Sequence, residues 1–194
     1  VSLASQVGIT NVINAATSAG IPADTPGIEQ NLTFVLGSAS PHPLDVAAAY
    51  ATFAAEGMHA TPYLIQQISG RNGGLLFEAT PQAASMLDAE ATRVVNWTLQ
   101  KVVTAGTGSA ARALGRPVAG KTGTTDQNKS AWFAGYTPQL AAAVMLVKQD
   151  AAGNPITLSG TGGMRSVAGG SFPARIFTAF MKGALANVTA TRFT

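Results

Sequence analysis

The segment GRPVAGKTGTTDQNKSAWFAGYTP, residues 115–138, holds the densest set of residues whose types and spacing could perform chemistry. Gly115 to Thr122 match G-x-x-x-x-G-K-T, the pattern of a loop whose backbone amides and lysine bind nucleotide phosphates. Lys121, Thr122 and Gly123 also spell Lys-Thr-Gly, a signature of serine enzymes that transfer acyl groups. The residues on either side of the motif decide between these two chemistries.

The flanking residues favour a strand over a phosphate-binding loop. A phosphate loop follows a buried β-strand and leads into a helix whose N-terminus faces the phosphates. The residues before Gly115 are SAARAL, without a β-branched side chain, and those after Thr122 are GTTDQNKS, which is typical of a turn. We therefore predict an extended strand over residues 118–124, and nucleotide binding is kept as a remote alternative.

An extended strand at this position would suit an anionic ligand with an extended backbone. The Lys121 ammonium can face the ligand, and the hydroxyls of Thr122 and Thr124 can donate hydrogen bonds to a carboxylate. Gly123 has no side chain that would keep a ligand backbone from pairing with the strand. The same letters also occur in ordinary edge strands with a surface lysine, so the motif alone does not prove a site.

The composition of the 194-residue chain limits its partners. Apolar residues make up 46% of the chain, enough for the core of one domain or of a large piece of one. The 12 basic and 9 acidic residues give a net charge of +3 without a basic block. We expect no nucleic-acid partner, because phosphate contacts need clustered Lys and Arg.

Metal and cofactor binding are not expected either. The chain has no cysteine, which excludes disulfides and thiolate metal sites. His42 and His59 have no second histidine at ligand spacing, so both are predicted to be surface-loop residues. We predict no metal and no organic cofactor.

The hydrophobic pattern predicts helices, a hairpin and a run of strands. Helices are expected at residues 1–7, from a Thr10 cap to Gly20, at 41–57, from Asp88 to the loop TAGTGS, and from Ser171 onward. The Asn72-Gly73 pair predicts a hairpin between 63–69 and 75–78. Further strands are expected at 118–124, 131–136 and 140–148. Short connections force neighbouring strands to be antiparallel, so the predicted fold class is α+β.

Several side chains are predicted to serve packing. The final helix is expected to bury Ile176, Phe177, Phe180, Met181 and Leu185. Trp97, Trp132, Phe133 and Tyr136 are also interpreted as packing residues. The glycine-rich residues 160–170 are expected to form a flexible surface loop.

Four segments of the chain, taken in order, resemble the transpeptidase domain of class A, bifunctional penicillin-binding proteins. They are LGSASPHPLDVAAAYATFAAEG, GTGSAARALGRPVAGKTGT, GKTGTT followed by AWFAGYTP, and GGSFPARIFTAFMKGAL. The resemblance covers about residues 1–186 and matches the C-terminal part of that domain; residues 187–194 are interpreted as a tail or linker. It implies the penicillin-binding protein/β-lactamase-like fold, an antiparallel sheet with flanking helices, and places the glycine loop at 106–109 near the motif.

The resemblance also implies a chemistry and a role for each motif residue. Such enzymes attack the D-Ala-D-Ala amide of a peptidoglycan stem peptide with a serine, and β-lactams acylate the same serine. Lys121 would shape the electrostatics and attract the terminal carboxylate, which Thr122 and Thr124 would bind. Gly123 would admit the substrate backbone, the amide of Thr124 would be an oxyanion-hole donor, and Thr125 is a weaker member of the binding set.

Two of the motifs that the resemblance requires are not in the chain. No Lys has a Ser three residues before it, and no Asn has a Ser two residues before it, so both Ser-x-x-Lys and Ser-x-Asn are missing. The family carries both upstream of its Lys-Thr-Gly strand, and this chain opens abruptly on VSLASQVG. We expect a portion of a domain that is inactive alone and ordered beside its missing N-terminal part. The alternative is a homologue that lost catalysis and only binds the cell wall or a muropeptide.

The family further implies where the parent protein works. Its partners would be peptidoglycan stem peptides and β-lactam antibiotics. It would lie at the extracytoplasmic face of the bacterial cytoplasmic membrane, attached through an upstream anchor, with a glycosyltransferase domain upstream.

Overall fold

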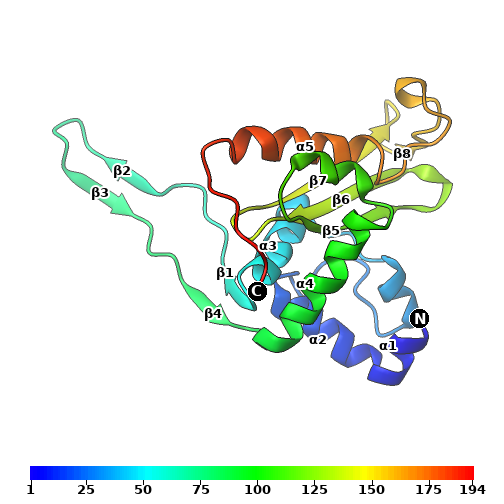
Figure 1. Ribbon diagram of the computed structural model, residues 1–194, viewed down its shortest axis with the longest axis horizontal. Coiled ribbons are helices and arrows are strands. Elements are labelled where there is room, and N and C mark those ends of the chain that lie inside the picture. The colour runs from blue at the N-terminus through cyan, green and yellow to red at the C-terminus, as the bar shows by residue number, and fades with distance from the viewer.

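The computed structural model describes residues 1–194 and has the predicted α+β architecture, with only antiparallel strand pairs (Figure 1). The main sheet has the order β5 (Ala119–Thr124), β6 (Ser130–Tyr136), β7 (Ala141–Gln149) and β8 (Pro155–Ile156). Two-stranded pairs join β1 (Met58–Ala60) to β4 (Ala83–Ser85) and β2 (Gln67–Ser69) to β3 (Leu75–Glu78). The helices are α1 (Ser2–Val7), α2 (Ile9–Ala19), α3 (Pro43–Ala54), α4 (Ala89–Thr104) and α5 (Phe172–Ala184), with 3-10 turns η1 (Leu32–Leu36), η2 (Ser109–Leu114), η3 (Asp126–Asn128) and η4 (Thr161–Gly163).

Local sequence signals explain where the elements begin and end. The Asp88 carboxylate accepts a hydrogen bond from the Ala91 amide at 2.8 Å and so caps α4, as expected for a helix that starts after an aspartate. In the predicted hairpin, Gly73 has a φ of 78°, and the Asn72 side chain accepts a bond from the Gly74 amide at 3.1 Å. Of these residues only Gly73 is in the left-handed region, and its amide donates to the Gly70 carbonyl at 2.9 Å in the turn that joins β2 to β3.

The predicted ends of two helices are wrong. Helix α2 begins after Gly8 and not after Thr10, and no side chain caps it. Helix α3 ends at Ala54, and Gly57 lies in the turn that follows, with a φ of 95°. A Cβ at Gly57 would lie 2.2 Å from the Leu87 carbonyl oxygen, so the turn requires glycine at this position.

The first face of the main sheet packs on α5. Phe133 of β6 and Phe177 of α5 are fully buried, with ring centroids 4.9 Å apart. Gly135 lies between these rings, because a Cβ there would be 2.7 Å from Phe133 and 2.9 Å from Phe177. Phe177, Met181 and Leu185 are buried as predicted, but Ile176 and Phe180 are 45% and 55% exposed. The apolar stripe of α5 is therefore wider than the surface that covers it.

The second face packs on α3 and is linked to α4 by a buried hydrogen bond. The Tyr136 hydroxyl donates to Asn96 Oδ1 at 2.6 Å, and the Asn96 amide donates to the Phe53 carbonyl at 3.1 Å. The Tyr136 ring also contacts Tyr50 edge to face, with centroids 5.9 Å apart. Because Asn96 and Tyr136 are both at most 1% exposed, this pair fixes α4 relative to the sheet.

Two further predictions about side chains are wrong. Trp97 is 62% exposed on α4, where the Lys101 ammonium lies 4.9 Å from its ring centroid. His59 is not a surface-loop residue, because it lies in β1 with its Nδ1 2.9 Å from the hydroxyl of buried Thr52.

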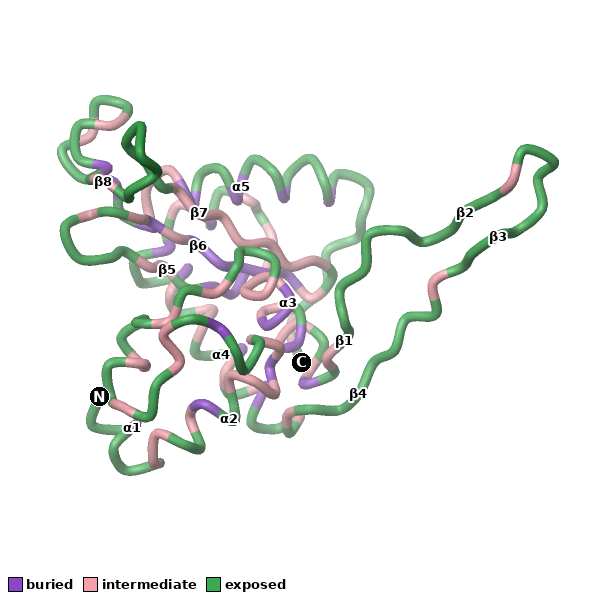
Figure 2. The backbone as a smooth tube through the Cα atoms, turned by 180° about the vertical axis from the view of Figure 1, so that it is seen from behind, coloured by how far each residue is buried: buried purple, intermediate pink, exposed green.

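The β2–β3 hairpin projects as a long arm from the body (Figure 1), and nearly all of it is exposed (Figure 2). At the other end of the chain, residues 187–194 have no helix or strand but return along the body. The Gln139 amide donates to the Thr189 carbonyl at 3.0 Å, and Phe193 contacts the Tyr136 ring. None of the five α-helices combines the length and the apolar character that crossing a membrane requires.

Replacement of Tyr136 by Phe tests the buried link between α4 and β6. The substitution keeps the ring but leaves Asn96 Oδ1 buried without its donor, so the free energy of unfolding should fall by about 1–3 kcal/mol. Urea unfolding measures this change. Tyr63→Phe is the matched control, because Tyr63 is 51% exposed and its loss should change the stability by less than about 0.5 kcal/mol. Equal stabilities of the two variants would contradict the assigned role.

The same tyrosines predict a loss of stability at alkaline pH. Desolvation by burial raises the pKa of Tyr50 to about 12 and also raises that of Tyr136, with the charge of Tyr50 as a second cause for Tyr136. The side chain of an unfolded tyrosine has a pKa of about 10. The stabilisation is therefore complete below about pH 10 and is lost as the pH rises toward the folded values. Urea midpoints between pH 8 and 12 should fall less steeply for Tyr136→Phe than for the unsubstituted protein.

Candidate functional site

Strand β5 leaves the core as it runs along the motif. Gly115, in the left-handed region with a φ of 75°, turns the chain out of η2, and Val118 and Ala119 are buried. Lys121 and Thr124 are exposed at the margin of the sheet. No α-helix follows Thr122 directly, and only the 3-10 turn η3 begins at Asp126, so the segment has the predicted extended form and not that of a phosphate-binding loop. The predicted strand is confirmed.

The hydrogen-bond register directs two backbone amides at the exposed end of β5 outward. β5 pairs with β6 on one side and has no strand on the other. The Thr125 amide donates to the Ser130 carbonyl at 3.1 Å, and hydrogen-bonded pairs alternate with non-bonded pairs along an antiparallel ladder. Two residues earlier, Gly123 therefore bonds to β6, while the amides of Thr122 and Thr124 point toward the free edge.

The side chains of the motif divide between the two faces of the sheet. Lys121 pairs with Ala134 and lies on the face of Tyr136 and α3. Thr122 and Thr124 lie on the opposite face, which packs on α5. The lysine and the hydroxyls can therefore reach one ligand only at the free edge, where both faces meet.

Lys121 carries the one motif charge, and no acidic side chain neutralises it. Its ammonium donates to the Thr122 carbonyl at 2.9 Å. The only ion pairs in the chain join Arg93 to Glu56 and to Glu90. The edge of β5 therefore offers a cation and outward amides, a combination that binds carboxylates and oxyanions.

Each hydroxyl of the motif has a partner from another segment. The Thr122 Oγ1 lies 2.7 Å from the Thr107 Oγ1, in the loop between α4 and η2. The Thr124 Oγ1 accepts a hydrogen bond from the Gly169 amide at 3.2 Å. The predicted closeness of residues 106–109 to the motif is confirmed. The contact between Gly169 and Thr124 was not predicted from the sequence.

Residues 160–166 are mostly exposed, as predicted for a surface loop, but the last residues of this segment pack on the sheet. Val167 is fully buried, and a Cβ at Gly169 would lie 2.1 Å from the Trp132 carbonyl oxygen and 2.8 Å from that of Gly123. The Gly169-Gly170 pair lets the backbone cross directly over β5 before α5 begins. Two adjacent glycines before a helix were the only signal of this close approach in the sequence.

Thr125 and Asn128 hold the turn after the strand. The Thr125 Oγ1 accepts from the Ser130 amide at 2.8 Å, so this hydroxyl closes the turn and does not face the edge. Asn128, with a φ of 55°, donates to the Val167 carbonyl at 2.7 Å and accepts from the Val167 amide at 3.0 Å. Sequence reasoning placed Asn128 in a turn but did not identify this bond to the segment that crosses β5.

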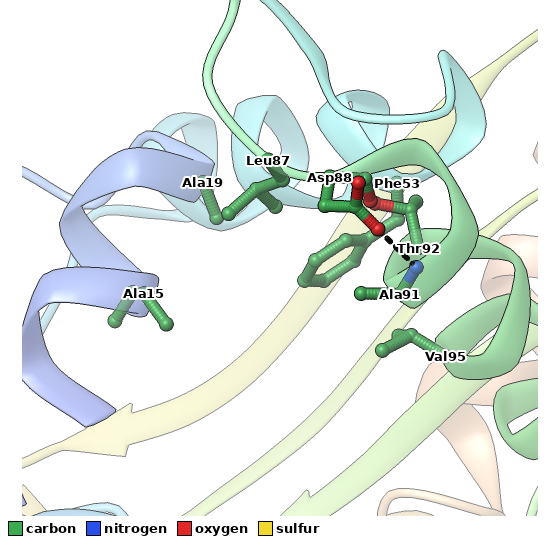
Figure 3. A pocket seen from close by; sticks show the side chains of 9 residues that line it. Ala15, Ala19, Phe53, Leu87, Asp88, Ala91, Thr92 and Val95 are labelled. Carbon is green, nitrogen blue, oxygen red and sulfur yellow. Dashed lines mark hydrogen bonds between the residues drawn. The ribbon is translucent and has the colours of Figure 1, made fainter. Parts of the chain in front are cut away.

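An apolar pocket lies elsewhere, between the helices. Figure 3 shows this apolar hollow of ≈ 310 Å³ between α2, α3 and α4, lined by residues such as Ala15, Phe53 and Val95. Its polar lining groups, Asp88 and Thr92, are occupied in capping and backbone bonds of α4. The pocket includes no residue of β5, so the candidate site is the sheet margin and not this hollow.

Known proteins are similar to this chain in sequence. The family described as penicillin binding protein transpeptidase domain matches residues 2–177. Penicillin-binding protein 1A of Aquifex aeolicus is 35% identical over 74% of this chain and 19% of its own length. Penicillin-binding protein 1A of Mycobacterium tuberculosis is 36% identical over 90% of this chain and 23% of its own. The chain thus spans about a fifth of the curated relatives that it matches.

Solved structures agree with the sequence matches. The penicillin-binding protein PonA1 from Mycobacterium tuberculosis superposes with a TM-score of 0.79 at 31% identity, covering 94% of this chain and 51% of that chain. PonA1 in complex with penicillin V gives 0.78 at 30% identity, covering the same fractions. Penicillin-Binding Protein 1A from Haemophilus influenzae, 24% identical with a TM-score of 0.84, covers 98% of this chain and 33% of that chain and shares the fold. On this sequence match and this fold, the chain belongs to the transpeptidase domain family of penicillin-binding proteins.

Proposed function

We propose that residues 1–186 are the C-terminal portion of a serine-type D,D-transpeptidase domain that cross-links peptidoglycan and is acylated by β-lactams. The observation that carries the proposal is the free edge of β5, where the outward amides of Thr122 and Thr124 lie beside the unneutralised Lys121. An extended peptide can pair with such an edge through its backbone. Support also comes from PonA1, a relative described in complex with penicillin V.

The nucleophilic serine belongs to a part of the domain outside residues 1–194. The sequence contains neither Ser-x-x-Lys nor Ser-x-Asn. The chain exposes 11410 Å², whereas a compact monomer of this mass exposes about 8,600 Å². Part of the excess is the hairpin arm, and part is apolar helix surface that includes Leu3, Val94 and Trp97. Such a surface is what remains exposed when a partner layer of the same domain is taken away.

Each motif residue has a role in the proposed acyl transfer. The Lys121 ammonium attracts the terminal carboxylate of the stem peptide and favours the ionised form of groups around the serine. The hydroxyls of Thr122 and Thr124 donate to that carboxylate, and Gly123 leaves room for the paired backbone. The Thr124 amide donates to the oxyanion that forms when the serine oxygen attacks the carbonyl carbon, a contribution of about 3 kcal/mol. Thr125 supports the turn that ends the strand.

The parent protein would act at the outer face of the bacterial cytoplasmic membrane, held by an anchor upstream of this chain. Its substrates would be peptidoglycan stem peptides. A glycosyltransferase domain upstream would make it bifunctional.

Removal of the Lys121 charge tests the proposed site. In the full-length protein, Lys121→Ala should lower the second-order rate constant of acylation by a fluorescent penicillin by about 10²-fold or more, because the carboxylate and the developing oxyanion lose a cation. Gel fluorescence over time measures the rate. Lys101→Ala, which removes an exposed lysine of α4, is the control and should leave the rate unchanged. Reversible muropeptide binding without any covalent adduct would instead indicate a protein that only binds the cell wall.

A second pair of variants separates the amide of Thr124 from its hydroxyl. Thr124→Val removes the hydroxyl alone, whereas Thr124→Pro also removes the outward amide, which bonds to no strand and is therefore dispensable to the sheet. The Pro variant should be acylated about 10²–10³-fold more slowly than the Val variant. Thermal unfolding of both variants confirms that they fold. Equal rates would show that this amide is not an oxyanion-hole donor.

A further inference from the structure

We propose that Thr107 is a positioning residue, which donates its hydroxyl proton to Thr122 and thereby keeps the Thr122 proton available for the ligand carboxylate. This inference rests on the proposed function, in which Thr122 contacts the carboxylate. Thr107 lies fifteen residues before Thr122, outside the motif, and its hydroxyl is the nearest partner of Thr122, at 2.7 Å.

The loop that carries Thr107 is held firmly. The Gly108 amide donates to the Val102 carbonyl at 2.9 Å, which folds the loop against the last turn of α4. A Cβ at Gly106 would lie 2.9 Å from that same carbonyl oxygen, and a Cβ at Gly108 would lie 3.0 Å from the buried Phe133 ring. The two glycines allow the loop to press on α4 and on the core, so the Thr107 hydroxyl has a fixed place.

A third segment closes over the hydroxyl pair. A Cβ at Gly170 would lie 2.1 Å from the Thr107 carbonyl oxygen and 3.9 Å from the Thr122 methyl carbon. The segment before α5 thus packs on both threonines at once. The pair lies where three segments converge, and its geometry is set by backbone contacts.

The count of protons determines which hydroxyl must donate. Each threonine hydroxyl has one proton, and an ionised carboxylate only accepts hydrogen bonds. If Thr122 gives its proton to the ligand, its oxygen can bond to Thr107 only by accepting, so Thr107 must be the donor. If Thr122 donates to Thr107 instead, it has no proton left for the ligand.

The Thr124 hydroxyl also accepts a hydrogen bond from another segment, which supports the assignment of Thr107 as the donor to Thr122. Its hydroxyl accepts from the Gly169 amide, a group that can only donate, so the Thr124 proton is free. Thr122 and Thr124 lie on one face of β5, and each has a partner from a different segment. With Thr107 as donor, both hydroxyls direct their protons to the same ligand.

The test compares penicillin V with its methyl ester in the full-length protein. The ester keeps the reactive ring but lacks the negative carboxylate. Thr107→Val should slow acylation by penicillin V about 5- to 30-fold, because a hydrogen bond to a charged group is weakened. It should change acylation by the ester less than about twofold, because the ester lacks that charged acceptor. Thr107→Ser retains a donor and should restore most of the rate with penicillin V.

Thr122→Val and the double variant complete the design. Thr122→Val should slow acylation by penicillin V at least as much as Thr107→Val, and adding Thr107→Val to it should cause no further loss, because the two side chains act as a unit. Thermal midpoints identify any variant that fails to fold, and Thr107→Ala then replaces Thr107→Val.

Three outcomes would overturn the inference. Equal slowing with penicillin V and its ester would show that Thr107 only supports the structure. Normal acylation of Thr107→Val together with impaired Thr122→Val would remove Thr107 from the site and leave the proposed function intact. Normal acylation of Thr122→Val would contradict the role proposed for Thr122 itself, and the inference would fail with it.

Discussion

The pairing of β5 with β6 on one side only determines what the molecule can offer to a ligand. An antiparallel ladder uses alternate backbone groups of each strand, so an outer strand keeps the other half of its amides and carbonyls unpaired. At the exposed end of β5 these unpaired groups belong to Thr122 and Thr124, between Lys121 on one face and the hydroxyls on the other. A second strand on this side would consume the same groups. The proposed site therefore requires that this edge stay open.

The supports of this edge connect it to the core on both faces of the sheet. On one face, the buried bond between Asn96 and Tyr136 fixes α4, and the C-terminal end of α4 delivers the loop that carries Thr107. On the other, Val167 is buried under the strand and brings Gly169 to Thr124. Site geometry and core packing are thus coupled through short connections of two or three residues.

The sequence predicted the parts of this arrangement that depend on local signals. The strand at 118–124 followed from its flanks, the hairpin from Asn72-Gly73, and the start of α4 from Asp88. The partners of the motif hydroxyls could not be predicted in this way, because Thr107 and Gly169 are 15 and 45 residues away in sequence and meet β5 only through tertiary packing. Trp97, Ile176 and Phe180 were predicted to be packed but are exposed. A hydrophobic pattern shows which face of a helix is apolar, but not how much of that face a neighbouring element covers.

The division of the motif between two faces has a stereochemical consequence. A residue paired along the β5 edge directs its substituent to one face of the sheet, and its mirror image directs it to the other. One face here carries an ammonium group, and the other carries two threonine side chains beneath a glycine backbone. Because the two faces differ, the substituent of a bound residue meets different groups in each enantiomer. The edge can therefore distinguish a D residue from an L residue.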